Sequence, residues 1–264
     1  MPVGAWAIYK RELKSTMRRT STWVAFGLLF SVVGLYFIWV LGQFAQESRD
    51  FERSFVISLP DAPNLTRDVV QVTYGFLSFM LLFVIPLLTM RTIASERASH
   101  TLEILVTCPI GDWSILLGKY LALVTLGAGV VAIALSYPLA VYILTLEYPV
   151  TAPEASAVVS CSLGLFMIFA SYGAFGLMAS AMTESQVTAS IVTMAGLILW
   201  HMVGEVNPPR PEMREWIAEL SALRRTENLF YGLVSLRDLV FFATASCFFL
   251  FVAARALESR RWRA

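Results

Sequence analysis

Charged side chains are scarce in this chain. Only 15% of its 264 residues are Asp, Glu, Lys or Arg, whereas 57% are hydrophobic, and the mean hydropathy is +0.67. A soluble globule of this length needs more polar side chains to cover its surface. The formal net charge is only +1 and no basic patch is interleaved with aromatics, so we expect a lipid membrane and no nucleic acid as partner.

Cysteine and histidine are also rare, with three and two residues. One cysteine falls in a polar connection and two fall inside apolar runs, so no pair predicts a disulfide. His201 and Glu205, one helical turn apart, could begin an intramembrane metal site, but the only other histidine, His100, is expected on the opposite side of the membrane. An intramembrane enzyme is therefore a weak alternative, and we expect His201 and Glu205 to be a polar pair that caps a span.

Two further absences concern the source of energy. No stretch has the Gly-x-x-x-x-Gly-Lys-Ser/Thr pattern of a P-loop, because Gly118-Lys119 has the wrong spacing before it and no hydroxyl residue after it. No predicted span carries an ionisable residue near its centre, although ion-coupled carriers usually need one. We expect a non-catalytic chain without a cofactor or metal of its own, so that any energy for transport enters through another subunit.

Long apolar runs make up most of the chain. About 20 apolar residues are needed for a helix to cross the hydrocarbon core. Six runs are long enough, and the expected spans are 22–42, 70–90, 115–146, 156–182, 187–204 and 238–256. The sequence therefore predicts an all-α, polytopic membrane protein in which residues 1–264 form a single transmembrane domain.

Residues 5–20 predict an amphipathic helix before the first span. Apolar and basic residues recur there on opposite faces at helical spacing. The residues concerned are Trp6, Tyr9, Lys10, Arg11 and Leu13. Aromatics suit the headgroup boundary and cations suit an anionic inner leaflet, so we expect an interfacial helix. The alternative is a simple positive-inside anchor.

The distribution of Lys and Arg also predicts how the chain is oriented in the membrane. They are most concentrated in the short segments at both chain ends, so we expect both termini in the cytoplasm. Residues 43–68 then form an outer loop with at most one helical turn.

Pro138 predicts a kink in the third span. Gly173, Gly176 and Ala179 in the fourth predict a helix-packing seam, with a substrate-lining wall as the alternative.

An apolar outer segment follows the fifth span. Prolines after Asn207 stop the helix, and apolar residues then recur at helical spacing. These residues are Trp216, Leu220, Leu223 and, in a second apolar piece, Tyr231. We expect residues 211–234 to enter the bilayer as a re-entrant helical hairpin. Two helices on the outer surface are the alternative.

A polar segment at 91–119 separates the second and third spans. Residues 96–107 have helical character with Leu102 and Leu105 as an apolar ridge, Pro109 stops the helix, and Asp112 is expected to be the N-cap of the next span. A helix held between two spans can transmit a displacement of a cytosolic partner to both spans. The alternative is a loop helix without a partner.

This segment resembles a known family. The pattern Glu96-Arg97-x-x-x-Thr101-Leu102-Glu103-x-Leu105-x-Thr107-x-Pro109, followed by Gly118-Lys119, is similar to the stretch between the second and third spans of type-2 ABC exporter permeases. The closing Glu227-Asn, Tyr231-Gly-Leu and Leu257-Glu258-Ser-Arg-Arg-Trp262 resemble the branch with gliding-motility and nitrous-oxide-reductase maturation permeases. The sequence departs from the family's usual pattern at His100 and Cys108.

The resemblance implies a half-transporter whose cytosolic coupling helix spans about 96–107. The coupling residues are then Glu96, Arg97, Thr101, Leu102, Glu103, Leu105 and Pro109. It also implies a second permease subunit, identical or related, and two ATPase subunits that bind ATP and Mg²⁺. With the resemblance goes the expectation that the membrane is a bacterial inner membrane. The cargo is not specified. An alternative function within the same family is a complex that uses ATP to act on an envelope partner without moving cargo.

Overall fold

The computed structural model describes residues 2–53, 63–94, 111–145, 153–205, 217 and 219–261. Every regular element in these ranges is a helix. The elements are α1 (Pro2–Arg18), α2 (Thr20–Arg53), the π-helix η2 (Thr66–Gln71), α3 (Val72–Thr89), α6 (Asp112–Ala134), α7 (Ser136–Leu144), α8 (Ala155–Met182), α9 (Gln186–Met202), the 3-10 helix η4 (Val203–Glu205), α11 (Ala222–Phe230) and α12 (Leu236–Arg261). The expected all-α fold is confirmed.

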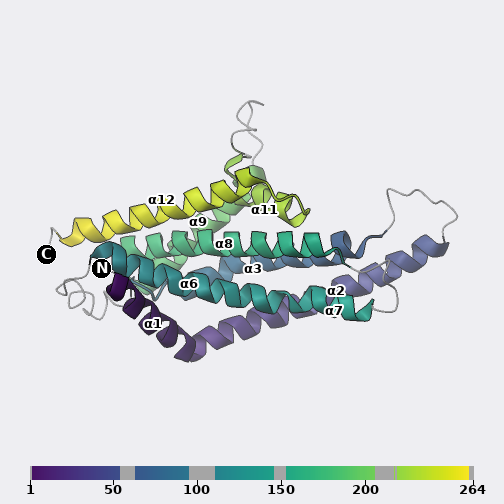
Figure 1. Ribbon diagram of the computed structural model, residues 1–264, viewed down its shortest axis with the longest axis horizontal. Coiled ribbons are helices and arrows are strands. Elements are labelled where there is room, and N and C mark those ends of the chain that lie inside the picture. Colours follow the sequence, from purple (N-terminus) through teal and green to yellow (C-terminus); the bar gives the residue numbers. More distant parts are fainter. Residues whose placement is uncertain are drawn as a thin grey trace.

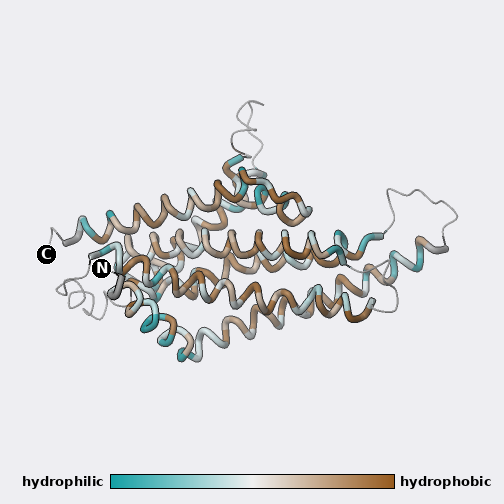
Figure 2. Tube along the Cα trace, viewed as in Figure 1, coloured by the Kyte–Doolittle hydropathy of each residue, from teal (hydrophilic) through white to brown (hydrophobic). Residues whose placement is uncertain are grey.

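Among the described residues, six helical segments are long and apolar enough to cross a membrane. They are Thr20–Phe51, Thr66–Thr89, Asp112–Leu144, Ala155–Met182, Gln186–Glu205 and Leu236–Ser259. They run side by side, with both chain termini at one end of the bundle (Figure 1). Hydrophobic residues fill their middle portions, and the hydrophilic ones gather towards the ends and around α11 (Figure 2). Each predicted span overlaps one of these segments, so the six-span prediction is confirmed.

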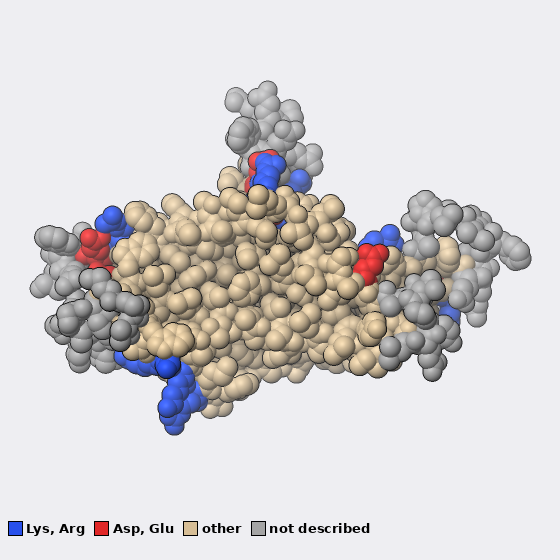
Figure 3. All heavy atoms as spheres, in the orientation of Figure 1, with Lys and Arg blue, Asp and Glu red and all other residues tan. Residues whose placement is uncertain are grey.

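The surface has the same distribution. A broad uncharged area covers the middle of the bundle, and Lys, Arg, Asp and Glu lie at its two ends and beside α11 (Figure 3). Charge at the ends and an apolar belt between them are what a bilayer requires of the protein that it surrounds.

Helix α8 lies at the centre of the bundle, where it packs against α3, α6, α9, α11 and α12. Small residues allow these close approaches. A Cβ atom on Gly176 would lie only 2.3 Å from Thr89 Oγ1 of α3. Helix α8 and α3 can therefore meet this closely only if position 176 has no side chain, and the predicted packing seam is confirmed at Gly176. A Cβ atom on Gly173 would lie 4.0 Å from Leu123 of α6, so that position is not a close approach.

Two predictions concern where helices end or are interrupted. The prediction of a loop from residue 43 was wrong for its first part, because α2 continues to Arg53. Residues 43–53 contain no glycine or proline and are mostly good helix formers, so nothing stops the helix where its apolar run ends. The helix is interrupted at Leu135, between α6 and α7, three residues before Pro138, because proline cannot donate a backbone hydrogen bond. The kink itself stays a prediction.

Helix α11 packs beside the first third of α8 and not beyond its end (Figure 1). Ser160 of α8 donates a hydrogen bond to the carbonyl of Leu229, and Cys161 Sγ lies 3.4 Å from the carbonyl oxygen of Phe230. Leu220 and Tyr231 are exposed. Residues 211–216, including Trp216, lie outside the described part of the chain, so the re-entrant hairpin stays a prediction.

Candidate functional site at a buried lysine

Lys119 is a charged residue in the interior of the bundle. It lies in the second turn of α6, and its side chain is only 1% exposed. Its Nζ donates a hydrogen bond of 2.6 Å to the carbonyl oxygen of Thr92 and lies 3.4 Å from Glu12 Oε2 of α1. We call Glu12, Thr92 and Lys119 the lysine junction.

The close contact between α1 and α6 brings Glu12 to Lys119. A Cβ atom on Gly118 would lie 2.8 Å from the carbonyl oxygen of Ala5 and 2.9 Å from Ile8 Cγ2. Only glycine therefore lets the two helices approach this closely. Ile8 and Glu12, one helical turn apart, are both buried against α6.

The start of α6 corrects one prediction. Asp112 is the first helical residue and not the N-cap. The N-cap is Gly111, whose backbone is extended and which has no side chain to accept a hydrogen bond. Asp112 still places a carboxylate in the first turn, where it interacts favourably with the positive end of the helix dipole.

The chain that leaves α3 is held on two sides. Lys119 binds the carbonyl of Thr92, and the backbone N–H groups of Ile93 and Ala94 donate to Ser180 Oγ of α8 at 3.3 and 3.1 Å. Ile93 and Ala94 are fully buried. The last residues before position 95 are therefore joined to α1, α6 and α8 together.

The lysine junction is sensitive to the loss of any one member. A buried ammonium group needs a carboxylate and hydrogen-bond acceptors to replace its water, and here Glu12 and the Thr92 carbonyl supply both. Removing one partner of a buried ion pair costs about 3–5 kcal/mol, because the other charge is left uncompensated.

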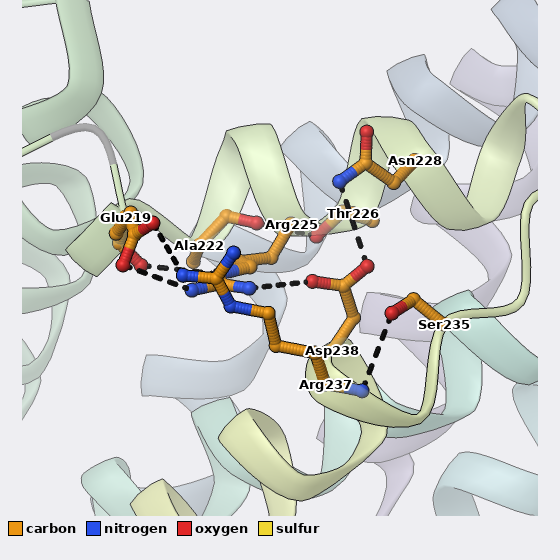
Figure 4. A network of polar contacts seen from close by, with 8 residues as sticks. All are labelled: Glu219, Ala222, Arg225, Thr226, Asn228, Ser235, Arg237 and Asp238. Carbon is orange, nitrogen blue, oxygen red and sulfur yellow. Dashed lines mark hydrogen bonds and ion pairs between the residues drawn. The ribbon is translucent and has the colours of Figure 1, made fainter. Parts of the chain in front are cut away.

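A second polar network joins α11 to α12 (Figure 4). Arg225 Nη1 donates to Asp238 Oδ1 at 2.9 Å, and the two side chains are only 11% and 2% exposed. The Arg225 Nε also donates to the carbonyl oxygen of Glu219 at 3.1 Å. Arg237 pairs with the carboxylate of Glu219. This network fixes the start of α12 against α11.

Comparison with known proteins shows the family of this chain. The sequence profile described as ABC-2 family transporter protein matches residues 6–216, which include the whole lysine junction. This chain belongs to the ABC-2 transporter family. No curated protein matches it. The chain is therefore an integral membrane permease subunit of an ABC transporter, a type of subunit that is generally non-catalytic and works with an ATPase partner.

The match confirms the resemblance seen in the sequence at the level of the family, and the branch stays a prediction. The predicted coupling residues, Glu96 to Pro109, all lie outside the described residues of this ABC-2 permease. What the structure does describe is the anchor of the chain entering that segment, namely the lysine junction and Ser180.

The residues predicted for the interfacial helix lie on α1, with Trp6, Lys10 and Arg11 exposed and Tyr9 and Leu13 half-buried. Trp6 and Tyr9 are stacked with ring centroids 4.9 Å apart, and Lys10 Nζ lies 5.2 Å from the Trp6 ring centre. Leu13 also packs against the core, and the Tyr9 hydroxyl lies 3.2 Å from Thr125 Oγ1 of α6. The most deeply buried stripe, however, is a neighbouring one that contains Glu12. Periodicity of apolar residues could not find it, because its key member is charged.

The predicted pairing of His201 with Glu205 is wrong. His201 Nδ1 is instead hydrogen-bonded to the hydroxyl of Tyr172 at 2.7 Å, while Glu205 lies in η4 at the end of the helix. Within the described ranges, no group of three His, Cys, Asp or Glu side chains could hold a metal ion.

Sequence reasoning missed the lysine junction and the Arg225–Asp238 pair of this permease. Lys119 counted only as a cation that flanks the membrane, although it lies inside a predicted span. An ionisable residue within an apolar run is itself a signal of a buried partner. The signal does not say which partner, because Glu12 is 107 positions away.

Proposed function

We propose that this ABC-2 permease is the membrane half of an exporter driven by ATP. Two permease subunits form the path, and two ATPase subunits bind ATP and Mg²⁺ and drive it. The observation that supports the proposal is the anchoring of Thr92–Ala94 by Lys119 and Ser180, directly before the segment that resembles a coupling helix.

The coupling works through a rigid connection. The ATPase holds residues 96–107, and their movement passes into α3 and, through the lysine junction and Ser180, into α6, α1 and α8. A connection that is buried and hydrogen-bonded transmits such a displacement, whereas a loosely attached loop would absorb it. The end of the bundle that carries both termini then faces the cytoplasm, as the cation bias predicts.

A second permease subunit is part of the proposal because of the packing around α8. This helix is enclosed by five others, and its small residues serve close helix contacts. One chain therefore offers little interior for a path, and the space between two subunits supplies it. Cross-linking in membranes should trap a homodimer, or a heterodimer with a related permease.

The test replaces Leu102 and Leu105 by Asp together. Two carboxylates would be buried without partners in the ATPase groove, so docking should be lost while membrane insertion is unchanged. The variant should reach the membrane at the normal level, lose the ATPase on purification and abolish the cellular activity. Charge reversal of Glu103 to Lys is the milder control, because a charge at the rim shifts the association rate more than the affinity. Full activity and a retained ATPase in the double variant would show that 96–107 does not couple.

A further inference from the structure

A cavity of about 520 Å³ opens beside α11, well away from the lysine junction. It lies between η2 and the start of α3 on one side and the end of α9, η4 and α11 on the other. We call it the α3–α11 cavity. Its polar lining includes Arg67, Asp68, Gln71, His201, Glu205 and Glu227. The volume is in the range of cavities that hold small molecules.

His201 supplies a hydrogen-bond donor to this cavity. The residue is 4% exposed, and Tyr172, its partner at Nδ1, is completely buried. The Tyr172 hydroxyl must donate its hydrogen, and among the described residues His201 Nδ1 is the acceptor within reach. The hydrogen of the neutral ring is then on Nε2, for which no hydrogen-bond partner occurs in the described part of the chain. His201 therefore lines the cavity with an unused N–H.

Gln71 supplies an acceptor. Its Oε1 is buried and has no hydrogen-bond partner among the described residues. Gln71 is the last residue of η2, and π-turns of this kind are often found at functional sites. A buried amide oxygen without a donor is unfavourable, so rotation of the Gln71 side chain toward a ligand that brings a donor is favoured.

The charges around the cavity favour a cation. Arg67 Nε lies 2.7 Å from Asp68 Oδ1, so these two charges offset each other. Glu205 and Glu227 remain, and the neighbouring cavity that they also line contains Arg224, Arg225 and Arg237. Arg225 is paired with Asp238 and Arg237 with Glu219, so Arg224 is the cation that acts on Glu227. Partial burial, followed by the charge of Glu205, raises the pKa of Glu227, and Arg224 opposes this only in part. The positive charge near Glu205 and Glu227 is therefore smaller than their combined negative charge.

The remaining walls are apolar. Phe79 of α3 and Leu223 and Phe230 of α11 line the same space as the carboxylates and Gln71. One side of the cavity therefore suits a hydrocarbon body, and its polar groups suit a head that carries several N–H donors.

We propose that the α3–α11 cavity binds an amphipathic amine. The hydrocarbon body packs against Phe79, Leu223 and Phe230, and the ammonium group lies at the carboxylates of Glu205 and Glu227. Gln71 Oε1 accepts from the ammonium group once its side chain turns toward the cavity. His201 Nε2 donates to a hydroxyl or carbonyl oxygen near the head. The inference goes beyond the proposed function and stands without it.

The experiment uses the full chain in phosphatidylcholine nanodiscs, without ATPase or nucleotide. A long-chain amine with a photoactivatable group at its far end is cross-linked, and the labelled peptides are identified by mass spectrometry. The carboxylic acid and the alcohol of the same chain length are the matched probes. The amine should label segments 66–79 and 222–231 about tenfold more than either, as expected for one charge-assisted contact.

Gly75 offers a clean way to fill the cavity. It lines the space, and a Cβ atom there would have no neighbour within 4 Å, so Gly75→Leu adds bulk without disturbing the packing. Gly129→Leu is the matched control, because that position also has no neighbour within 4 Å but is on the exposed surface of α6. Labelling should be lost in the first variant and kept in the second. Glu227→Gln should weaken it, whereas Glu47→Gln, on the exposed part of α2, should not.

Two outcomes would overturn the proposal. Equal labelling by the acid or the alcohol would mean that the cavity takes any lipid chain. Unchanged labelling of Gly75→Leu would place the amine elsewhere. Because no ATPase is present, either result leaves the proposed function untouched, and a failure of ATPase docking in the leucine variant would leave this inference untouched.

Discussion

The charge balance of the lysine junction can be tested by a double-mutant cycle on Glu12 and Lys119. Glu12→Gln keeps the shape of the side chain but removes the charge that lies 3.4 Å from Lys119 Nζ. At this separation and an effective dielectric constant of about 20, the attraction is about 5 kcal/mol. The Thr92 carbonyl and the new amide oxygen still accept hydrogen bonds, so we expect a loss of about 3 kcal/mol in the free energy of unfolding.

Lys119→Met should also destabilise the chain, because it leaves the buried carboxylate of Glu12 without its cation. The effect should be smaller than that of Glu12→Gln, since the Glu12 side chain is 10% exposed and that of Lys119 only 1%. The double variant removes both charges together. Its cost should fall below the sum of the two single costs by about 2 kcal/mol, because neither charge is then left alone.

The assay is reversible unfolding of the purified chain in mixed micelles of sodium dodecyl sulfate and dodecyl maltoside, followed by tryptophan fluorescence. Additive costs, within about 0.5 kcal/mol, would show that Glu12 and Lys119 do not interact and would refute the reasoning. The Glu12→Gln variant should still bind the ATPase, because residues 96–107 are unchanged, yet have lower cellular activity. Normal activity would show that the junction is structural only.

Three further predictions use other parts of the chain. Cysteines at Lys14 and Glu47, both exposed at opposite ends of the bundle, should be labelled from opposite sides of the membrane, and labelling from the same side would show that the span count is wrong. Gly118→Leu should cost about 1–3 kcal/mol in the unfolding assay because α1 must move away from α6, while Gly129→Leu should be near neutral. The raised pKa of Glu227 means that its contribution to stability is present below the ordinary glutamate pKa and is lost as the pH rises through the raised value. Glu227→Gln should therefore be more stable than the natural chain at neutral pH, and this difference should shrink as the medium is acidified; a difference that grows instead would contradict the assigned shift.

Local sequence was sufficient for the membrane architecture. A span needs only about 20 consecutive apolar residues, so composition along the chain predicts each one without knowledge of its neighbours. The same reasoning expected a disturbance near Pro138, and the helix is interrupted at Leu135, because proline acts on its own helix. It failed at residues 43–53, where the apolar run ended but the helix did not, because helix propensity and membrane burial are separate causes.

Residues 96–109 carried the family resemblance, and the profile match to 6–216 confirms the family. A short motif can identify a relationship because its residues are adjacent in the chain. It says nothing about which distant side chains support it. The coupling role of 96–107 therefore stays a prediction from sequence, while its anchor was visible only in the fold.

Tertiary structure alone decided which polar groups are buried together. Glu12 and Thr92 approach Lys119 from positions 107 and 27 residues away. His201 is hydrogen-bonded to Tyr172 of another span and not to Glu205, which lies one turn along its own helix. A buried charge or hydrogen-bonding group must find a partner at about 3 Å, whatever its distance along the chain. Helix packing determines that partner, and no local pattern in the sequence records it.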